Sequence, residues 1–311
     1  MLRVTNSTIY DRITTQLAQQ QTRLALTQEK LTTGRNFLRP SDAPDQVAAL
    51  DRLESSVRET EQFTSNVERI KDKLNFQELS INSIHEELIR AKELLIQGAN
   101  GTMDANLRLS MAIELESIYE SVAAIGNQKD IDGSYLFGGY KQDDPPFDVN
   151  ANPLDPNVGF NGMYKGDDEV QVIGIDRSYM LSVGMPGSQL FSGFEDSSGN
   201  KTDLFSSLKK AINALKSNDL SEIQNSIDAV GNASTYVNIK LTQIGSRMKV
   251  VENQLTVLSD RSATLESTIS QVEDLDYVSA ITDLKNQSLA LQAGQQSFAQ
   301  ISNLSLFNYI R

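Results

Sequence analysis

The chain has few side chains capable of chemistry, and their spacing assembles no reaction centre. Among its 311 residues there is one histidine, His85, and no cysteine, which excludes disulfides, zinc fingers and thiol catalysis. Without a second histidine, His85 is expected in a helix seam or on the surface, not at a metal. The sequence also lacks the phosphate-binding, nucleophile-elbow and zinc-protease motifs of common enzymes. We expect no enzyme, no cofactor and no small-molecule substrate, although composition alone leaves an all-carboxylate hydrolase open.

Two acidic segments are the remaining candidates for metal or acid-base chemistry. The Asp-x-Asp-Gly at 130–133 suggests a calcium loop, but in that register the first ligand would be Gln128 and the last Gly139, and neither supplies the required carboxylate. The Asp-Asp-Glu at 167–169 has no accompanying cluster of partners. We therefore expect solvated turns here, with no metal, catalytic or cofactor-binding residue.

Composition favours long helices and argues against several classes of partner. The formal charge of −13 argues against nucleic acid and against an anionic membrane, because either would be met by a basic surface. Only 6% of residues are aromatic and tryptophan is absent, which suits helices better than an enzyme core. No apolar run is long enough to span a bilayer. The first ten residues lack the blocks of a cleaved signal peptide, so export by the ordinary secretory route is not expected.

A heptad pattern between residues 220 and 272 organises the chain. Alternating steps of three and four from Leu220 reach apolar residues at almost every position, which is the pattern of a helix supercoiled against neighbours. Such a rod would be roughly 80 Å long at 1.5 Å per residue. It needs a partner of similar length, because a long helix with an exposed seam is not stable alone. Asp219 is expected to cap its start.

A second heptad stripe of similar length, on a helix that starts near residue 44, supplies the partner for this rod. Ser41 or Asp42 is expected to cap this helix, with Pro44 in its first turn. Leu107 to Ile125 then forms an antiparallel return helix after a turn at 98–101. The stripe recurs every seven residues, at Leu53, Thr60, Val67, Leu74, Ile81, Leu88 and Leu95.

Both chain ends carry weaker helical seams that need further cover. The N-terminal seam includes the polar residues Gln20 and Thr27, and Gly34 ends its helix. The C-terminal seam includes Ile281 and is interrupted by Gly294, and its apolar end needs another chain to cover it. The residues expected to form the assembly interface are Ile13, Leu17, Leu24, Leu31, Leu284, Leu291, Phe298, Leu304, Leu306, Phe307 and Ile310.

The middle of the chain is of a different kind, because most of the prolines and glycines lie there. Apolar runs at 170–175 and 179–183 flank a polar turn, which predicts a β-hairpin. The fold class is therefore mainly α: an elongated antiparallel helical bundle or coiled coil built from both chain ends, with a small inserted β domain. We expect terminal helical regions at 1–44 and 266–311, a bundle at 45–139 and 200–265, and the β domain at 140–199, facing outward.

Several short segments together resemble the flagellin superfamily. They are Met1 to Ser7, Leu31 to Arg35, Pro40 to Pro44, Gly133 to Gly139, Glu273 to Tyr277, and Leu304 to Phe307. The Pro-Ser-Asp-x-Pro break and the Leu-Phe ending look more like the hook-filament junction members of the superfamily than like filament flagellins. The resemblance covers both ends and hardly touches the β insertion. Ala43 departs from it where a second Asp is expected, which weakens the capping of the second helix.

The resemblance implies a structural role and a set of partners. Such proteins are exported unfolded through the flagellar type III channel, without a cleaved signal peptide, and lie outside the cell at the hook-filament junction. The implied partners are the first hook-associated protein, flagellin, copies of the chain itself in a ring, and an export chaperone at the C-terminal region. Terminal helices would pair in the inner tube and order only on assembly. Filament flagellin, or a secreted helical binding or effector protein, remains the alternative.

Overall fold

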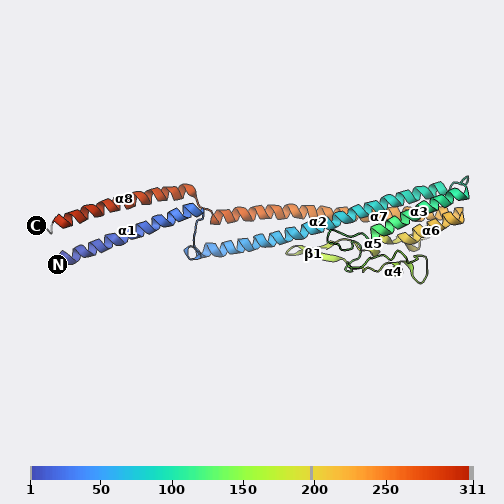
Figure 1. The fold of residues 1–311 in the computed structure, drawn as a ribbon, viewed down its shortest axis with the longest axis horizontal. Coiled ribbons are helices and arrows are strands. Elements are labelled where there is room, and N and C mark those ends of the chain that lie inside the picture. The colour runs from blue at the N-terminus through green and yellow to red at the C-terminus, as the bar shows by residue number, and fades with distance from the viewer. Residues whose placement is uncertain (1, 197–198, 308–311) are drawn as a thin grey trace. The chain divides into compact units, whose positions relative to one another are not determined.

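The computed structural model describes residues 2–196 and 199–307, with side chains at 8, 10–196 and 199–300. Its helices are α1 (Leu2–Thr33), η1 (Pro40–Asp42), α2 (Pro44–Gly98), α3 (Ala105–Gly126), α4 (Gly159–Met163), α5 (Gly187–Phe191), α6 (Leu204–Ser217), α7 (Leu220–Glu273) and α8 (Tyr277–Phe307). Its strands are β1 (Gln171–Asp176), β2 (Tyr179–Val183), β3 (Ser192–Glu195) and β4 (Lys201–Asp203). The predicted mainly α fold with a small β insertion is confirmed (Figure 1).

The chain divides into two compact units, Met1–Thr60 with Asp260–Arg311, and Glu61–Ser259. The first holds α1 and α8, and the second holds α3, α6 and the strands. The long helices α2 and α7 contribute to both. Our division at residues 44, 139, 200 and 266 remains a prediction. Among the described residues, no helix combines the length and the apolar character that crossing a membrane requires.

The heptad stripes are the core of the second unit. Every predicted α2 position from Val67 to Leu95 is fully buried, and α7 buries a residue every seven positions from Ile223 to Leu258. Their spacing follows from the 3.5-residue period of packed helices. His85 on α2 lies in this contact, with its Nδ1 3.3 Å from the Ser234 hydroxyl of α7, as expected for a seam histidine.

Helices α3 and α6 pack against each other beside α2 and α7 (Figure 1). The apolar face of α6 is buried at Leu204, Leu208, Ile212 and Leu215. In α3, Leu115, Ile118 and Val122 are buried and Ile125 is half-buried, but Leu107 is exposed. Leu107 lies outside the packed face, which in the first turns of α3 passes through Arg108 and Ala112 instead.

The insertion is built from two antiparallel strand pairs, β1 with β2 and β3 with β4. The predicted hairpin is confirmed, with Ile173 opposite Leu181. Its inner face is buried at Ile175 and Val183, while Val172 on the opposite face is exposed. This alternation is the period-two pattern of a strand pair with one solvated face.

The helix starts agree in part with the sequence. Asp219 caps α7 as predicted, because its carboxylate accepts from the amides of Ser221 and Glu222 at 3.0 and 3.2 Å. The predicted cap of α2 is wrong. The Asp42 carboxylate instead accepts from the Arg39 amide at 3.1 Å. Because α2 begins at Pro44, the residue before its first turn is Ala43, whose side chain has no hydrogen-bond acceptor.

Candidate functional site

The first candidate site is the seam between α1 and α8, which lie side by side (Figure 1). All seven predicted interface residues with described side chains are half-buried, and they recur along the facing sides of the two helices. On α1 the polar residues Gln20 and Thr27 share this face. The half-buried predicted residues are Ile13, Leu17, Leu24, Leu31, Leu284, Leu291 and Phe298.

Three contacts fix how the two helices meet. The rings of Tyr10 and Phe298 pack edge to face, with centroids 5.6 Å apart. The Thr27 hydroxyl donates to Gln287 Oε1 at 3.0 Å. At Gly294 the helices approach so closely that a Cβ would stand 3.0 Å from the Leu17 side chain. A polar pair and a glycine notch in one seam favour a single axial register.

A few apolar side chains on the outer sides of the pair are exposed. Leu26 on α1 is 41% exposed, and Leu289 on α8 is 64% exposed. Ile281, which we assigned to the α8 seam, is 44% exposed instead, because the seam runs through Leu284. The predicted interface residues Leu304, Leu306 and Phe307 lie in α8 with side chains outside the described residues, and Ile310 lies outside them altogether.

Next to this seam, the two breaks in the helices contact each other. The Leu275 amide donates to the Gly34 carbonyl at 2.9 Å, and the Asn36 amide donates to the Glu273 carbonyl at 2.8 Å. Asp276 then caps α8, since its carboxylate accepts from the amide of Val278 at 3.0 Å. The end of α1 and the start of α8 are therefore held by one small antiparallel pairing.

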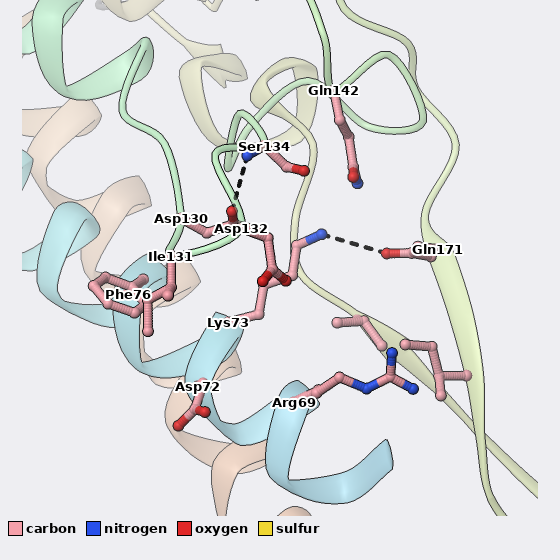
Figure 2. Close-up of a pocket in the computed structure, with 12 residues that line it drawn as sticks. Arg69, Asp72, Lys73, Phe76, Asp130, Ile131, Asp132, Ser134, Gln142 and Gln171 are labelled. Atoms are coloured by element: carbon pink, nitrogen blue, oxygen red, sulfur yellow. Dashed lines mark hydrogen bonds between the residues drawn. The ribbon is translucent and has the colours of Figure 1, made fainter. Parts of the chain in front are cut away.

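The second candidate is a cleft of about 260 Å³ in the other unit. It lies between α2, the loop after α3 and the β1–β2 hairpin, and Lys73 of α2 projects into it (Figure 2). The Lys73 Nζ donates to Gln171 Oε1 at 3.3 Å. Burial lowers the pKa of the Lys73 ammonium, and the nearby carboxylates of Asp130 and Asp132 offset part of that shift.

The cleft combines charges that largely balance. Arg69 and Lys73 supply two cations, and Asp72, Asp130 and Asp132 supply three carboxylates. A lining of this kind is suited neither to a phosphate, which needs a net positive site, nor to a divalent cation. Among residues 2–196 and 199–307, no group of three or more histidine, cysteine or acidic side chains is placed to hold a metal.

The acidic segments form turns, as predicted. The Asp130 carboxylate accepts from the Ser134 amide at 2.9 Å (Figure 2), and Gly133 takes the left-handed conformation with φ +82°. The Asp167 carboxylate accepts from the Glu169 amide at 2.6 Å. Both carboxylates serve the main chain of their own loop.

Sequence reasoning missed two buried polar residues that organise the second unit. Arg108 is 3% exposed and donates to the carbonyls of Gly98 and Asn100 at 2.8 Å each, and to the Asn218 side chain. Gln77 is fully buried and donates to the carbonyls of Leu136 and Met185. A polar residue within an apolar stripe was the sequence signal that could have indicated their burial. Their hydrogen-bond partners could not be inferred, because most of them lie far away in the sequence.

Comparison with known proteins identifies related chains over nearly the whole length. Residues 4–142 match the family model for the bacterial flagellin N-terminal helical region, and residues 227–310 match that for the C-terminal helical region. Together these two regions make up more than half of the chain. The two matched regions contain most of the long helices α1, α2, α7 and α8, and neither includes the β1–β2 hairpin.

Two curated relatives align with this chain over nearly their whole length. Flagellar hook-associated protein 3 of Escherichia coli K12 is 25% identical and covers 90% of each chain. Flagellar hook-associated protein 3 of Salmonella typhimurium LT2 is 23% identical and covers 100% of each. Among solved structures, Xanthomonas campestris FlgL has the same fold, with a TM-score of 0.61 at 16% identity, over 70% of this chain and 99% of that one.

Proposed function

We propose that this chain, which belongs to the bacterial flagellin family, joins the hook-associated proteins to the flagellin filament as a structural component of the flagellum. The observation that carries the proposal is the end-to-end match to two proteins named flagellar hook-associated protein 3. A filament flagellin is the second candidate, since both matching family models describe flagellin.

The proposed partners follow from this position. On the hook side the chain binds the first hook-associated protein, on the filament side it binds flagellin, and laterally it binds copies of itself in a ring. An export chaperone binds the C-terminal region before export. The chain lies outside the cell, in the flagellum, and binds neither nucleic acid nor membrane.

The mechanism is burial of apolar surface between subunits. The α1–α8 seam leaves its own residues only half-buried and leaves Leu26, Ile281 and Leu289 exposed. An apolar surface of this kind on two paired helices is stabilised when neighbours cover it. The role is structural, and we assign no catalytic step to the balanced cleft at Lys73.

Deletion of the gene in its own organism tests the proposal. We expect cells that keep hooks, lose filaments and release flagellin into the medium, with recovery when the intact gene is restored. Hooks are seen by electron microscopy and flagellin by immunoblot of the medium. Filaments composed mainly of this chain would favour the flagellin alternative. Unchanged motility in the deletion strain would overturn both and favour a secreted binding protein.

A further inference from the structure

The β1–β2 hairpin is held from both long helices of the second unit. Near its turn, the Asn66 side chain of α2 donates to the Gly174 carbonyl at 3.0 Å, and the Gln254 side chain of α7 donates to the Ile175 carbonyl at 3.2 Å. Both carbonyls belong to β1, and the two donors come from different helices. The end of the hairpin next to its turn therefore joins α2 to α7.

The other end of the hairpin is held in the same way. Gln77 of α2 donates to the Met185 carbonyl at 3.2 Å, and Arg247 of α7 donates to the Gly184 carbonyl at 2.6 Å. Carbonyls taken out of water need a donor, and the two helices supply it at both ends of the hairpin. An isolated two-stranded hairpin is marginal in water, so these contacts and its buried face keep it in place.

The hairpin contacts lie close to the limits of the second unit. Asn66 and Gln254 each lie five residues inside those limits, which are Glu61 and Ser259. The heptad residues of α2 and α7 outside the limits are only half-buried, at Leu53, Val57, Leu265 and Ile269. Full burial of the two heptad seams therefore ends close to where the hairpin ends.

The opposite end of the same helix pair is closed by a different contact. There Arg108 donates to the Gly98 carbonyl at the end of α2 and to the Asn218 side chain just before α7. Helix ends without such cover open first, because local opening costs least where few contacts hold the chain. The hairpin supplies the cover at the end from which α2 and α7 lead towards the chain termini.

We propose that the β1–β2 hairpin is a clamp that sets how far α2 and α7 remain helical and paired in the free chain. With the clamp closed, the paired helices are stable out to the region of Glu61 and Ser259. With the contacts near its turn lost, the two helices fray back together towards Gln77 and Arg247. The clamp acts within the second unit, needs no order in α1 or α8, and goes beyond the proposed place of the chain in the flagellum.

Hydrogen exchange on the purified full-length chain tests the clamp, with separate peptides for α2, α7 and the hairpin. Asn66→Ala and Gln254→Ala each remove one side-chain hydrogen bond to a carbonyl. Its loss should quicken exchange about 5-fold in residues 61–74 and 247–259 together. The discriminating effect is the one across helices, because Gln254→Ala on α7 should quicken exchange in α2, and Asn66→Ala on α2 should quicken it in α7.

The double variant Asn66→Ala with Gln254→Ala has a matched control in Gln62→Ala with Asn253→Ala. Gln62 lies one turn before Asn66, Asn253 lies next to Gln254, and both control side chains are exposed. Each pair replaces one asparagine and one glutamine, so the gain in helix propensity is the same. The control should leave exchange in both helices within about 2-fold of the intact chain.

Faster exchange in both helices near the hairpin, with residues 81–95 of α2 unchanged, supports the clamp. If only the hairpin exchanges faster, the helices do not depend on it and the clamp is overturned. It is also overturned if the effect stays on the helix that carries the substitution, spreads equally through the whole unit, or does not exceed that of the control. If the double variant fails to fold, the single variants still give the comparison across helices, because each removes one hydrogen bond of a half-buried side chain.

Discussion

The ring of Phe147 packs on the ring of Phe191, with centroids 4.6 Å apart. Phe147 also lies 5.2 Å from Phe205, which belongs to α6, and all three side chains are buried. Phe205 in turn packs on Tyr119 of α3. The segment 140–199 is therefore joined to the helices of its unit through one aromatic core.

Replacing Phe147 by Ala should lower the free energy of unfolding of the second unit by about 3–5 kcal/mol. The loss has two parts, the burial of the ring and the cavity that its neighbours cannot fill. Denaturant unfolding followed by helical signal measures it. Val149→Ala is the control, because Val149 lies two residues away and is 54% exposed, and it should change stability by less than about 0.5 kcal/mol.

A chain that joins Gly139 directly to Gly199 tests whether the segment is a separable domain. The sequence alone predicted an inserted domain, but the deletion removes Phe147 and Phe191 and uncovers Phe205. We expect a helical melting temperature lower than that of Phe147→Ala. An unchanged melt would show that the helices do not depend on the segment, and would support the predicted domain division.

The heptads predicted most of the fold because they are local. Spacing along one helix determines which residues face a partner, and the buried rows of α2 and α7 follow it. Leu107 and Ile281 were misassigned because apolar spacing alone does not determine which of two adjacent helix faces is packed. In α3 the packed face carries Arg108 and Ala112, and in α8 it carries Leu284. The pairing of Gly34 with Leu275, the aromatic core and the Arg108 contacts join residues far apart in sequence, so no local pattern indicates them. For the candidate site, the α1–α8 seam was predictable from its apolar period, and the cleft at Lys73 was not.

Arg108 should be essential to the turn where α2 passes into α3. It is almost fully buried and its guanidinium serves Gly98, Asn100 and Asn218 together. Arg108→Met should reduce stability by about 2–4 kcal/mol, because three acceptors lose a charged donor. Arg108→Lys should recover little, since an ammonium cannot reproduce the planar fork.

The control for Arg108 is Arg58→Met. Arg58 pairs with Glu54 across one helical turn, and its side chain is 66% exposed, so the change should stay below about 1 kcal/mol. Equal losses in the two variants would contradict the assigned role. The comparison is made from the denaturant concentrations at the unfolding midpoint, provided that the dependence of the free energy of unfolding on denaturant is the same in the two variants.

Tyr164 should make the second unit sensitive to alkali. Burial raises the pKa of its hydroxyl from 10.0 to about 12, and the hydroxyl lies 2.9 Å from the carbonyl oxygens of Phe137 and Asp167. Between pH 10 and 12 the unfolded chain therefore binds fewer protons than the folded one. The free energy of unfolding falls as pH rises across this window.

Tyr164→Phe should reduce the slope of the free energy of unfolding against pH by the equivalent of up to one proton. It should also lower stability at pH 8 by about 1–2 kcal/mol, because the carbonyls of Phe137 and Asp167 lose the one hydroxyl proton that they share. Tyr140→Phe is the control, since Tyr140 is 53% exposed. Denaturant unfolding at pH 8, 10, 11 and 11.5 gives the slopes. A Tyr164→Phe slope equal to that of the intact chain would contradict the assignment.

The last prediction separates the outer surface of α8 from its seam. Ile281 and Leu289 are 44% and 64% exposed, so Ile281→Ser with Leu289→Ser should change the free energy of unfolding by less than about 0.5 kcal/mol. If neighbouring subunits cover these side chains, the same double variant should fail to restore filaments in the deletion strain. Electron microscopy of that strain and denaturant unfolding of the purified variant give the two readouts.

Leu284→Ser is the matched variant, on the same helix but in the half-buried seam. It should weaken the α1–α8 pair and also fail to restore filaments, because the substitution removes apolar contact within one subunit. Ser288→Ala, on an exposed polar position, should affect neither readout. If the Ile281 and Leu289 double variant restores normal filaments, the outer face of α8 is not covered by neighbours, and the proposed burial between subunits must lie elsewhere on the pair.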